Sequence, residues 1–167
     1  VPTQSAVFYF HGDGGNEQDR NANNLAQAAC ARGNAPLIVS LRGNNQTWNR
    51  RHDRIGTPED DIGFTYSVMQ TLKREAGVQK IGVTGSSRGG GFDYALLSDA
   101  RTQGLIQAAA PHMGSSYCEA DDEVCKHRDS PYSITPNDMS RTSESFNNYS
   151  GAILHLHGTK DNVVPAP

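Results

Sequence analysis

Short apolar runs alternate with longer amphipathic ones along most of the chain. The short runs are largely apolar and bounded by turn residues, a pattern that is typical of buried strands. They lie at 5–10, 36–41, 80–85, 104–110 and 151–157. Regular alternation of such strands with helices predicts an α/β fold whose mostly parallel sheet is covered by helices on both faces.

The longer runs at 17–33 and 58–77 carry helical spacing. In the second run, Thr57 is expected to cap the helix, Pro58 to occupy its first position and Gly77 to end it. One apolar face is formed by Ile62, Tyr66, Met69 and Leu72. A third helix is expected to start at Ser87 and to run through "FDYALLSDA".

The segment 111–150 breaks this alternation. It is polar, rich in Ser, Asp and Asn, and has little periodicity. We interpret it as a lid-like excursion over the sheet edge, beside the functional site. Because 167 residues suit one folding unit, residues 1–167 are interpreted as a single domain.

Charge and composition narrow the range of partners. The formal net charge is −3, and 35% of the residues are hydrophobic. This balance gives no electrostatic reason to expect binding to nucleic acid or to an anionic membrane. No apolar run approaches the length of a membrane span. The sequence predicts no metal and no cofactor, and it favours no particular oligomeric state.

The three cysteines divide unequally. Cys118 and Cys125 bracket the short polar stretch "CEADDEVC", which a disulfide would close. Two free thiols, or two zinc ligands short of partners, are the alternatives, although the spacing matches no standard zinc pattern. A disulfide favours an oxidising, extracellular setting. Cys30 lies in an alanine-rich helical run, and we expect it to be reduced and buried like a small apolar residue.

The stretch "GVTGSSRGGG" (82–91) contains a candidate nucleophile. A nucleophile elbow needs small residues two places on either side of its serine, because a strand and a helix pass close together there. Ser87 has Gly85 and Gly89 at those places, whereas Ser86 would have Thr84 and Arg88. An apolar strand precedes Ser87 and a plausible helix follows it. The strand–turn–helix context therefore favours Ser87 as a nucleophile.

Two further stretches fit an acyl-transfer site. The first strand ends in "FHGDGGN" (10–16), whose backbone amides are able to face a developing oxyanion. We expect the amides of Asp13 and Arg88 to form the oxyanion hole, with the Asp13 carboxylate turned away. The last strand leads into "HGTKDNVVP" (157–165), where Asp161 occupies the place of a triad acid.

Together these motifs resemble a family of secreted α/β-hydrolase esterases that includes polyhydroxybutyrate depolymerases and feruloyl and acetylxylan esterases. The resemblance covers nearly the whole chain and includes "TWN" followed by "DDIGF" (60–64), "AAAPHMG" and "LHLHGTKDNVVP". It implies that Ser87 is the nucleophile, Asp161 the acid, and Asp13 and Arg88 the amide donors. Arg88 departs from the family, which usually has a small or neutral residue there. Its guanidinium is free to bind a substrate carboxylate, to pair with Asp13 or to reach solvent.

The resemblance also implies a catalytic histidine several dozen residues after the acid, whereas this sequence ends six residues after Asp161. We therefore expect an α/β-hydrolase fold that is truncated at its C-terminus. His112 comes after the strand that follows the elbow, and we expect it near the active face. It is a candidate substrate-binding residue and a poor candidate for the base, because the chain order would be wrong. Trp48 is a candidate for stacking a substrate ring, or an ordinary packed side chain.

The sequence thus predicts a serine esterase that acts through an acyl-enzyme on a small or polymeric ester, of polyester or feruloyl or acetyl type. Two alternatives stay open. One is a hydrolase-like binding domain that is catalytically incomplete, and the other is a peptidase or thioesterase on the same fold.

Overall fold

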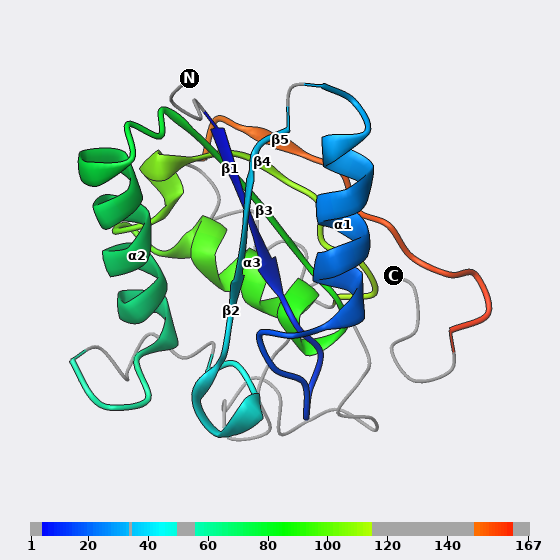
Figure 1. Ribbon diagram of the computed structural model, residues 1–167. Helices are drawn as coiled ribbons and strands as arrows, with labels where there is room; N and C mark the ends of the chain where they lie inside the picture. Colours follow the sequence, from blue (N-terminus) through cyan, green and yellow to red (C-terminus); the bar gives the residue numbers. More distant parts are fainter. Residues whose placement is uncertain (1–4, 34, 50–55, 115–148, 162–167) are drawn as a thin grey trace.

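The computed structural model describes residues 5–33, 35–49, 56–114 and 149–161. In these ranges the chain forms a parallel five-stranded sheet with the order β2-β1-β3-β4-β5 (Figure 1). The strands are β1 Ser5–Phe10, β2 Leu37–Leu41, β3 Lys80–Gly85, β4 Ile106–Ala109 and β5 Ala152–Ile153. All five predicted strands are therefore present, with β4 and β5 shorter than their apolar runs.

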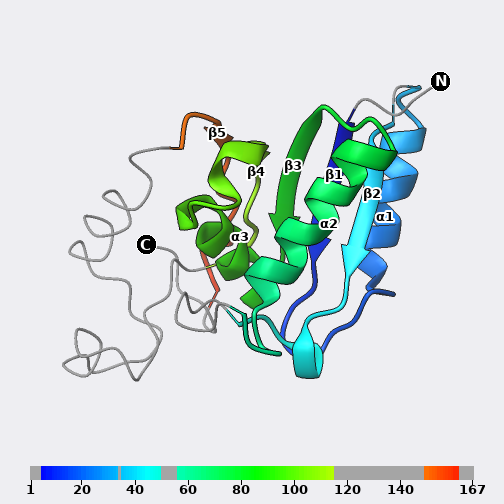
Figure 2. The same cartoon turned by 90° about the vertical axis from the view of Figure 1, so that its left-hand side faces the viewer.

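Helices cover both faces of the sheet, as predicted. Helix α1 (Arg20–Cys30) lies on one face, and α2 (Asp61–Glu75) and α3 (Arg88–Ser98) lie on the other (Figure 2). Two single 3-10 turns, η1 (Asn44–Gln46) and η3 (Gln103–Leu105), precede α2 and β4. The main core lies between the sheet and the pair α2 and α3. Its fully buried large side chains include Phe8, Phe10, Trp48, Ile62, Met69, Ile81, Phe92, Leu96 and Leu97.

Helix α2 begins three residues later than the proline at position 58 suggests. Asp60, rather than Thr57, is the cap, and its carboxylate accepts a hydrogen bond of 2.8 Å from the backbone N–H of Gly63. A charged cap at this end also interacts favourably with the helix dipole. The expected end of the helix is close to the observed one, because Gly77 follows the cap residue Ala76 with a φ of +67°.

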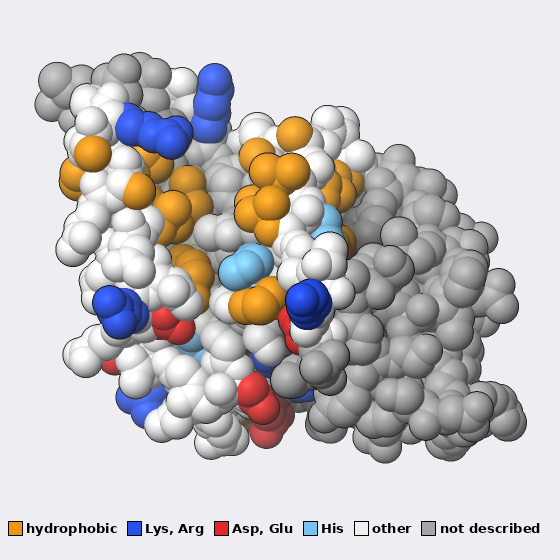
Figure 3. All heavy atoms as spheres, turned by 90° about the vertical axis from the view of Figure 1, so that its right-hand side faces the viewer, with side chains coloured by type: hydrophobic (Ala, Val, Ile, Leu, Met, Phe, Trp, Pro, Cys, Tyr) orange, Lys and Arg blue, Asp and Glu red, His pale blue; other side chains and the backbone are white. Residues whose placement is uncertain are grey.

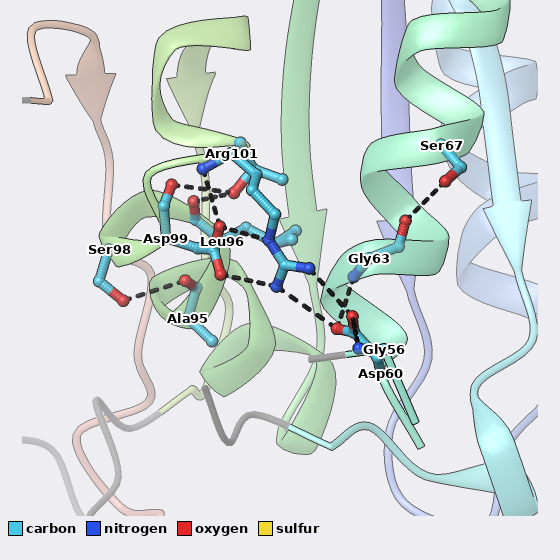
Figure 4. A network of polar contacts seen from close by, with 10 residues as sticks. Gly56, Asp60, Gly63, Ser67, Ala95, Leu96, Ser98, Asp99 and Arg101 are labelled. Atoms are coloured by element: carbon cyan, nitrogen blue, oxygen red, sulfur yellow. Dashed lines mark hydrogen bonds and ion pairs between the residues drawn. The ribbon is translucent and has the colours of Figure 1, made fainter. Parts of the chain in front are cut away.

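A partly buried ion-pair network explains why Asp60 is the cap (Figure 4). Arg101 follows α3 and donates to Asp60 at 2.9 Å and to both oxygens of Asp99 at 2.8–2.9 Å. The side chain of Arg101 is 25% exposed, and those of Asp60 and Asp99 are 10% and 5% exposed. Two-pronged contacts of this kind hold a guanidinium in one geometry. The network ties the start of α2 to the turn after α3.

The cysteines correct one expectation and leave another open. Cys30 is a free thiol as expected, but it is exposed rather than buried. It is the last residue of α1, a helix in which Ala22 alone is classed as buried, so its end does not reach the core. Cys118 and Cys125 lie outside the described residues, as does all of the 111–150 excursion except 111–114 and 149–150.

One edge of the sheet is apolar and open to solvent. Strand β5 is the last strand in the order given above, and Ile153, Leu154 and Leu156 are 43%, 61% and 46% exposed. Figure 3 shows hydrophobic and histidine side chains close together on the side of the molecule where α1 lies. None of the helices in the described ranges has the length and apolar character needed to cross a membrane.

Candidate active site

The candidate site lies where the sheet order reverses. The chain passes from β1 to β2 on one side and then returns to β3 on the other side of β1. In parallel α/β sheets, such a point leaves a crevice at the carboxyl ends of the strands. Here the loops after β1 and β3 are joined directly, because the N–H of Ser86 donates to the carbonyl of Phe10 at 3.0 Å.

Ser87 has the backbone conformation of a strained elbow. Its φ of +54° and ψ of −116° are unusual for a residue with a side chain. It follows β3 and is the cap residue of α3, so the strand–turn–helix setting predicted from sequence is present. The N–H of Ser87 donates to the carbonyl of His112 at 3.0 Å, which fixes the turn against the segment after β4.

The glycines around Ser87 are required by close backbone contacts. A Cβ atom added to Gly85 would lie 2.4 Å from the backbone of Gly89, and one added to Gly89 would lie 2.1 Å from the carbonyl oxygen of Phe10. Both separations are far below van der Waals contact. A Cβ atom on Gly12 would lie 3.7 Å from the Cβ of Ser87, which places the loop after β1 directly beside the candidate nucleophile.

Asp13 presents its backbone and its carboxylate to different surroundings. Its carboxylate accepts a hydrogen bond from the hydroxyl of Thr47. This contact accounts for an acidic residue at a candidate oxyanion position, because the charge is directed to a neighbouring loop. Among the described residues, no acceptor takes the backbone N–H of Asp13, which leaves it available to a ligand.

Arg88 and Trp48 are joined to each other. The Arg88 Nε donates to the carbonyl of Trp48 at 3.1 Å. The indole of Trp48 is fully buried, packs edge-on against Phe10 at 5.1 Å and stacks on Phe92 at 4.9 Å. The expectation that Trp48 stacks a substrate ring is therefore wrong, because the sheet and α3 cover its faces. It is the packed side chain of the alternative interpretation.

Asp161 lies at the end of a chain of polar side chains. One of its oxygens is 3.6 Å from His157 Nε2. His157 Nδ1 lies 3.1 Å from His155 Nε2, and His155 Nδ1 lies 2.6 Å from the hydroxyl of Tyr94 on α3. Burial lowers the pKa of His155, and the nearby His157 and His112 lower it further. Burial also raises the pKa of Tyr94 to about 12, so this chain of contacts is uncharged at His155 and Tyr94 near neutral pH.

No protein-family model matches the chain, and no curated protein does. Solved structures do match. Est1E from Butyrivibrio proteoclasticus, determined with bound ferulic acid, is similar over 98% of this chain and 73% of its own, with a TM-score of 0.66 and 13% identity. The carboxylesterase of Bacillus cereus is similar over 96% and 81%, with a TM-score of 0.58 and 15% identity.

A peptidase shares the same architecture. The acylaminoacyl peptidase of Pyrococcus horikoshii is similar over 99% of this chain and 29% of its own, with a TM-score of 0.62 and 20% identity. The chain has the α/β-hydrolase fold. At these identities the likeness establishes the fold alone.

Three described histidines have a polar neighbour at both ring nitrogens. His11 is fully buried, with Nδ1 2.7 Å from the carbonyl of Gly12 and Nε2 accepting from the N–H of Gly43 at 3.2 Å. His155 and His157 belong to the chain of contacts that ends at Asp161. His112 is exposed, and its backbone pairs with Ser86 and Leu156. His52 and His127 lie outside the described residues.

Sequence reasoning missed part of the site. The segment 43–49, between β2 and α2, contacts both the loop after β1 and Arg88. The sequence carries a signal for it, because "TWN" (47–49) lies in this segment and "DDIGF" (60–64) follows it. Among the described residues, no group of three His, Cys, Asp or Glu side chains is placed to hold a metal ion.

Proposed function

We propose that this protein is a serine hydrolase of carboxylic esters that works through an acyl-enzyme. Ser87 is the nucleophile, Asp161 is the acid of the triad, and the backbone amides of Asp13 and Arg88 form the oxyanion hole. The observation that carries the proposal is the strained backbone of Ser87 at the carboxyl end of β3. Strain of this kind is retained where surrounding contacts hold it, and it concentrates at functional sites.

The substrate class follows from the resemblance and from the matched structures. We propose an ester of the polyester, feruloyl or acetyl type, because carboxylesterases and a ferulic acid complex are among the similar structures. In the acylation step, the Ser87 Oγ attacks the ester carbonyl and the alcohol leaves. Water then attacks the acyl-enzyme, releasing the acid and restoring the serine. Both steps pass through an oxyanion that two amides would stabilise.

We propose that the general base is a histidine that follows Asp161 in the gene product. The chain order of an α/β-hydrolase triad supports this, because the histidine comes after the acid. The polar neighbours at both ring nitrogens of His11, His155 and His157 also support it. His112 then contacts substrate. The Cys118–Cys125 disulfide and an extracellular location belong to the same proposal.

A serine-directed fluorophosphonate tests the function, because labelling requires an activated hydroxyl. The protein extended by its downstream sequence should be labelled at Ser87 and should hydrolyse p-nitrophenyl acetate and methyl ferulate, and Ser87→Ala should abolish both. Residues 1–167 alone should show only the residual rate that an oxyanion hole and binding provide. An extended protein that takes up no probe would instead favour the ligand-binding alternative. Cleavage of acyl-peptides in preference to esters would favour a peptidase.

A further inference from the structure

The segment 43–49 holds the proposed oxyanion loop along its length. We name residues 43–49 the strap and residues 11–14 the oxyanion loop. Besides the Thr47 hydroxyl on the Asp13 carboxylate, three contacts join them: Gly43 N to His11 Nε2 at 3.2 Å, Gly14 N to the Gln46 carbonyl at 2.8 Å, and Trp48 Nε1 to the His11 carbonyl at 2.9 Å. The oxyanion loop is therefore shaped by the strap as well as by its own turn.

The strap also reaches the nucleophile elbow. The carbonyl of Trp48 accepts the Nε of Arg88, the residue directly after Ser87. The indole of the same residue donates to the oxyanion loop. Trp48 thus contacts both Arg88 and the oxyanion loop, the latter at His11, two residues before Asp13. A displacement of the strap would change the position of one proposed donor relative to the other.

The strap cannot hold this shape by local forces alone. Asn45 and Gln46 have positive φ values of 52° and 60°; asparagine tolerates this left-handed region, whereas glutamine seldom adopts it. A Cβ atom on Gly43 would lie 1.8 Å from the carbonyl oxygen of Thr47, so the turn is closed very tightly. Conformations of this kind persist only where neighbouring contacts determine them.

One carboxylate clamps both ends of the strap. Asp61, in the first turn of α2, is 5% exposed. One of its oxygens accepts the N–H of Asn44 at 3.2 Å, and the other accepts the N–H of Asn49 at 2.7 Å. Two acceptors on one planar group fix the distance between these two backbone positions. An asparagine would offer one acceptor and would turn an NH2 group toward the other N–H.

We propose that Asp61 is a positioning residue for the oxyanion hole: by clamping the strap at Asn44 and Asn49, it holds the amide of Asp13 at the site of the developing charge. This inference rests on the proposed function. Because the clamp acts on groups that stabilise the transition state, its loss should lower kcat with little change in KM. A donor displaced from an oxyanion hole costs up to roughly 100–1,000-fold in kcat.

The test compares Asp61→Asn with Asp60→Asn in the protein extended by its downstream sequence. Asp60 is the matched control, because it is the adjacent acid, caps α2 and pairs with Arg101, but does not contact the strap. At a temperature where both variants are folded, Asp61→Asn should lower kcat for p-nitrophenyl acetate by roughly 10–100-fold, a partial loss of the donor effect. Asp60→Asn should lower the melting temperature and leave kcat unchanged.

Trp48, the single tryptophan of the chain, provides a readout that does not depend on catalysis. Its emission should shift to longer wavelength in Asp61→Asn, because a displaced strap admits water to the indole, and should stay unchanged in Asp60→Asn. If Asp61→Asn does not fold, Thr47→Val removes one strap contact at almost constant volume. It should lower kcat in the same direction, again with KM unchanged.

The outcomes distinguish a failure of the positioning role from a failure of the proposed function. An active wild type whose Asp61→Asn variant retains kcat overturns the positioning role and leaves the proposed function standing. Equal losses of kcat in Asp61→Asn and Asp60→Asn also overturn it, since the effect would then be general destabilisation. A wild type that neither hydrolyses esters nor takes up a fluorophosphonate overturns the proposed function and the positioning role together.

Discussion

The strain at Ser87 predicts that its replacement by glycine stabilises the protein. A side-chain-bearing residue in such a sparsely populated region costs about 1–3 kcal/mol, and glycine removes that cost. Glycine also makes the unfolded chain more flexible, which costs about 0.5–1 kcal/mol. The balance is a gain of roughly 0–2.5 kcal/mol in the free energy of unfolding.

Ser86→Gly is the matched control, because it introduces the same flexibility one position earlier. Ser86 is not among the residues with a positive φ, so its replacement relieves no strain and should destabilise the protein. The flexibility cost is common to both variants and cancels between them. Their free energies of unfolding should therefore differ by the strain alone, about 1–3 kcal/mol in favour of Ser87→Gly.

Urea unfolding and thermal melting measure this difference. For a domain of this size it corresponds to roughly 2–12 °C in melting temperature. The two variants should also separate in function, since Ser86→Gly retains fluorophosphonate labelling and Ser87→Gly loses it. If Ser87→Gly is no more stable than Ser86→Gly, the backbone at Ser87 stores no strain, and the main support for its role as a nucleophile is lost.

Three further predictions concern buried charge, thiols and the base. Burial raises the pKa of Asp93 well above 3.8, so between the unfolded and folded pKa values the folded state keeps a proton that the unfolded chain releases, and stability falls as pH rises. In urea unfolding, the free energy of unfolding of Asp93→Asn should therefore gain on that of wild type by about 1.4 kcal/mol per pH unit in this interval. Parallel pH profiles of the two proteins would contradict this. Thiol titration of the denatured, non-reduced protein should find one free thiol, Cys30, whereas three would exclude the Cys118–Cys125 disulfide. His112→Ala should raise KM for esters in the extended protein and leave kcat nearly unchanged; loss of full activity would make His112 the base.

The sequence predicted the sheet because buried parallel strands appear in it as short apolar runs. Each strand falls within its run, and the glycines that identify the elbow are visible because backbone contact excludes any side chain at Gly85 and Gly89. Both signals are local. Periodicity and turn chemistry reflect constraints that act within about ten residues, so they can be recognised in the sequence without knowledge of tertiary contacts.

Expectations failed where contacts between residues far apart in the sequence determine the local structure. Thr57 and Asp60 are both good helix caps. Asp60 is favoured because Arg101, which is 41 residues away in the sequence, pairs with its carboxylate. Trp48 stands in a polar stretch that resembles surface, but Phe10 and Phe92 enclose it. Asp61 resembled an ordinary acid at a helix start, although its partners lie in the strap.

The same reasoning explains why a Gly-x-Ser-x-Gly sequence alone is weak evidence for an elbow. Two hydrogen bonds hold the turn at Ser87. The N–H of Ser87 donates to the carbonyl of His112, and the N–H of Ser86 donates to the carbonyl of Phe10. These bonds reach the end of β1 and the segment after β4, and these two strands flank β3 in the sheet. The positive φ cannot relax unless at least one of them breaks. The elbow is therefore a property of the strand order as much as of its five residues, and the same five residues outside such a sheet would be free to adopt an ordinary turn.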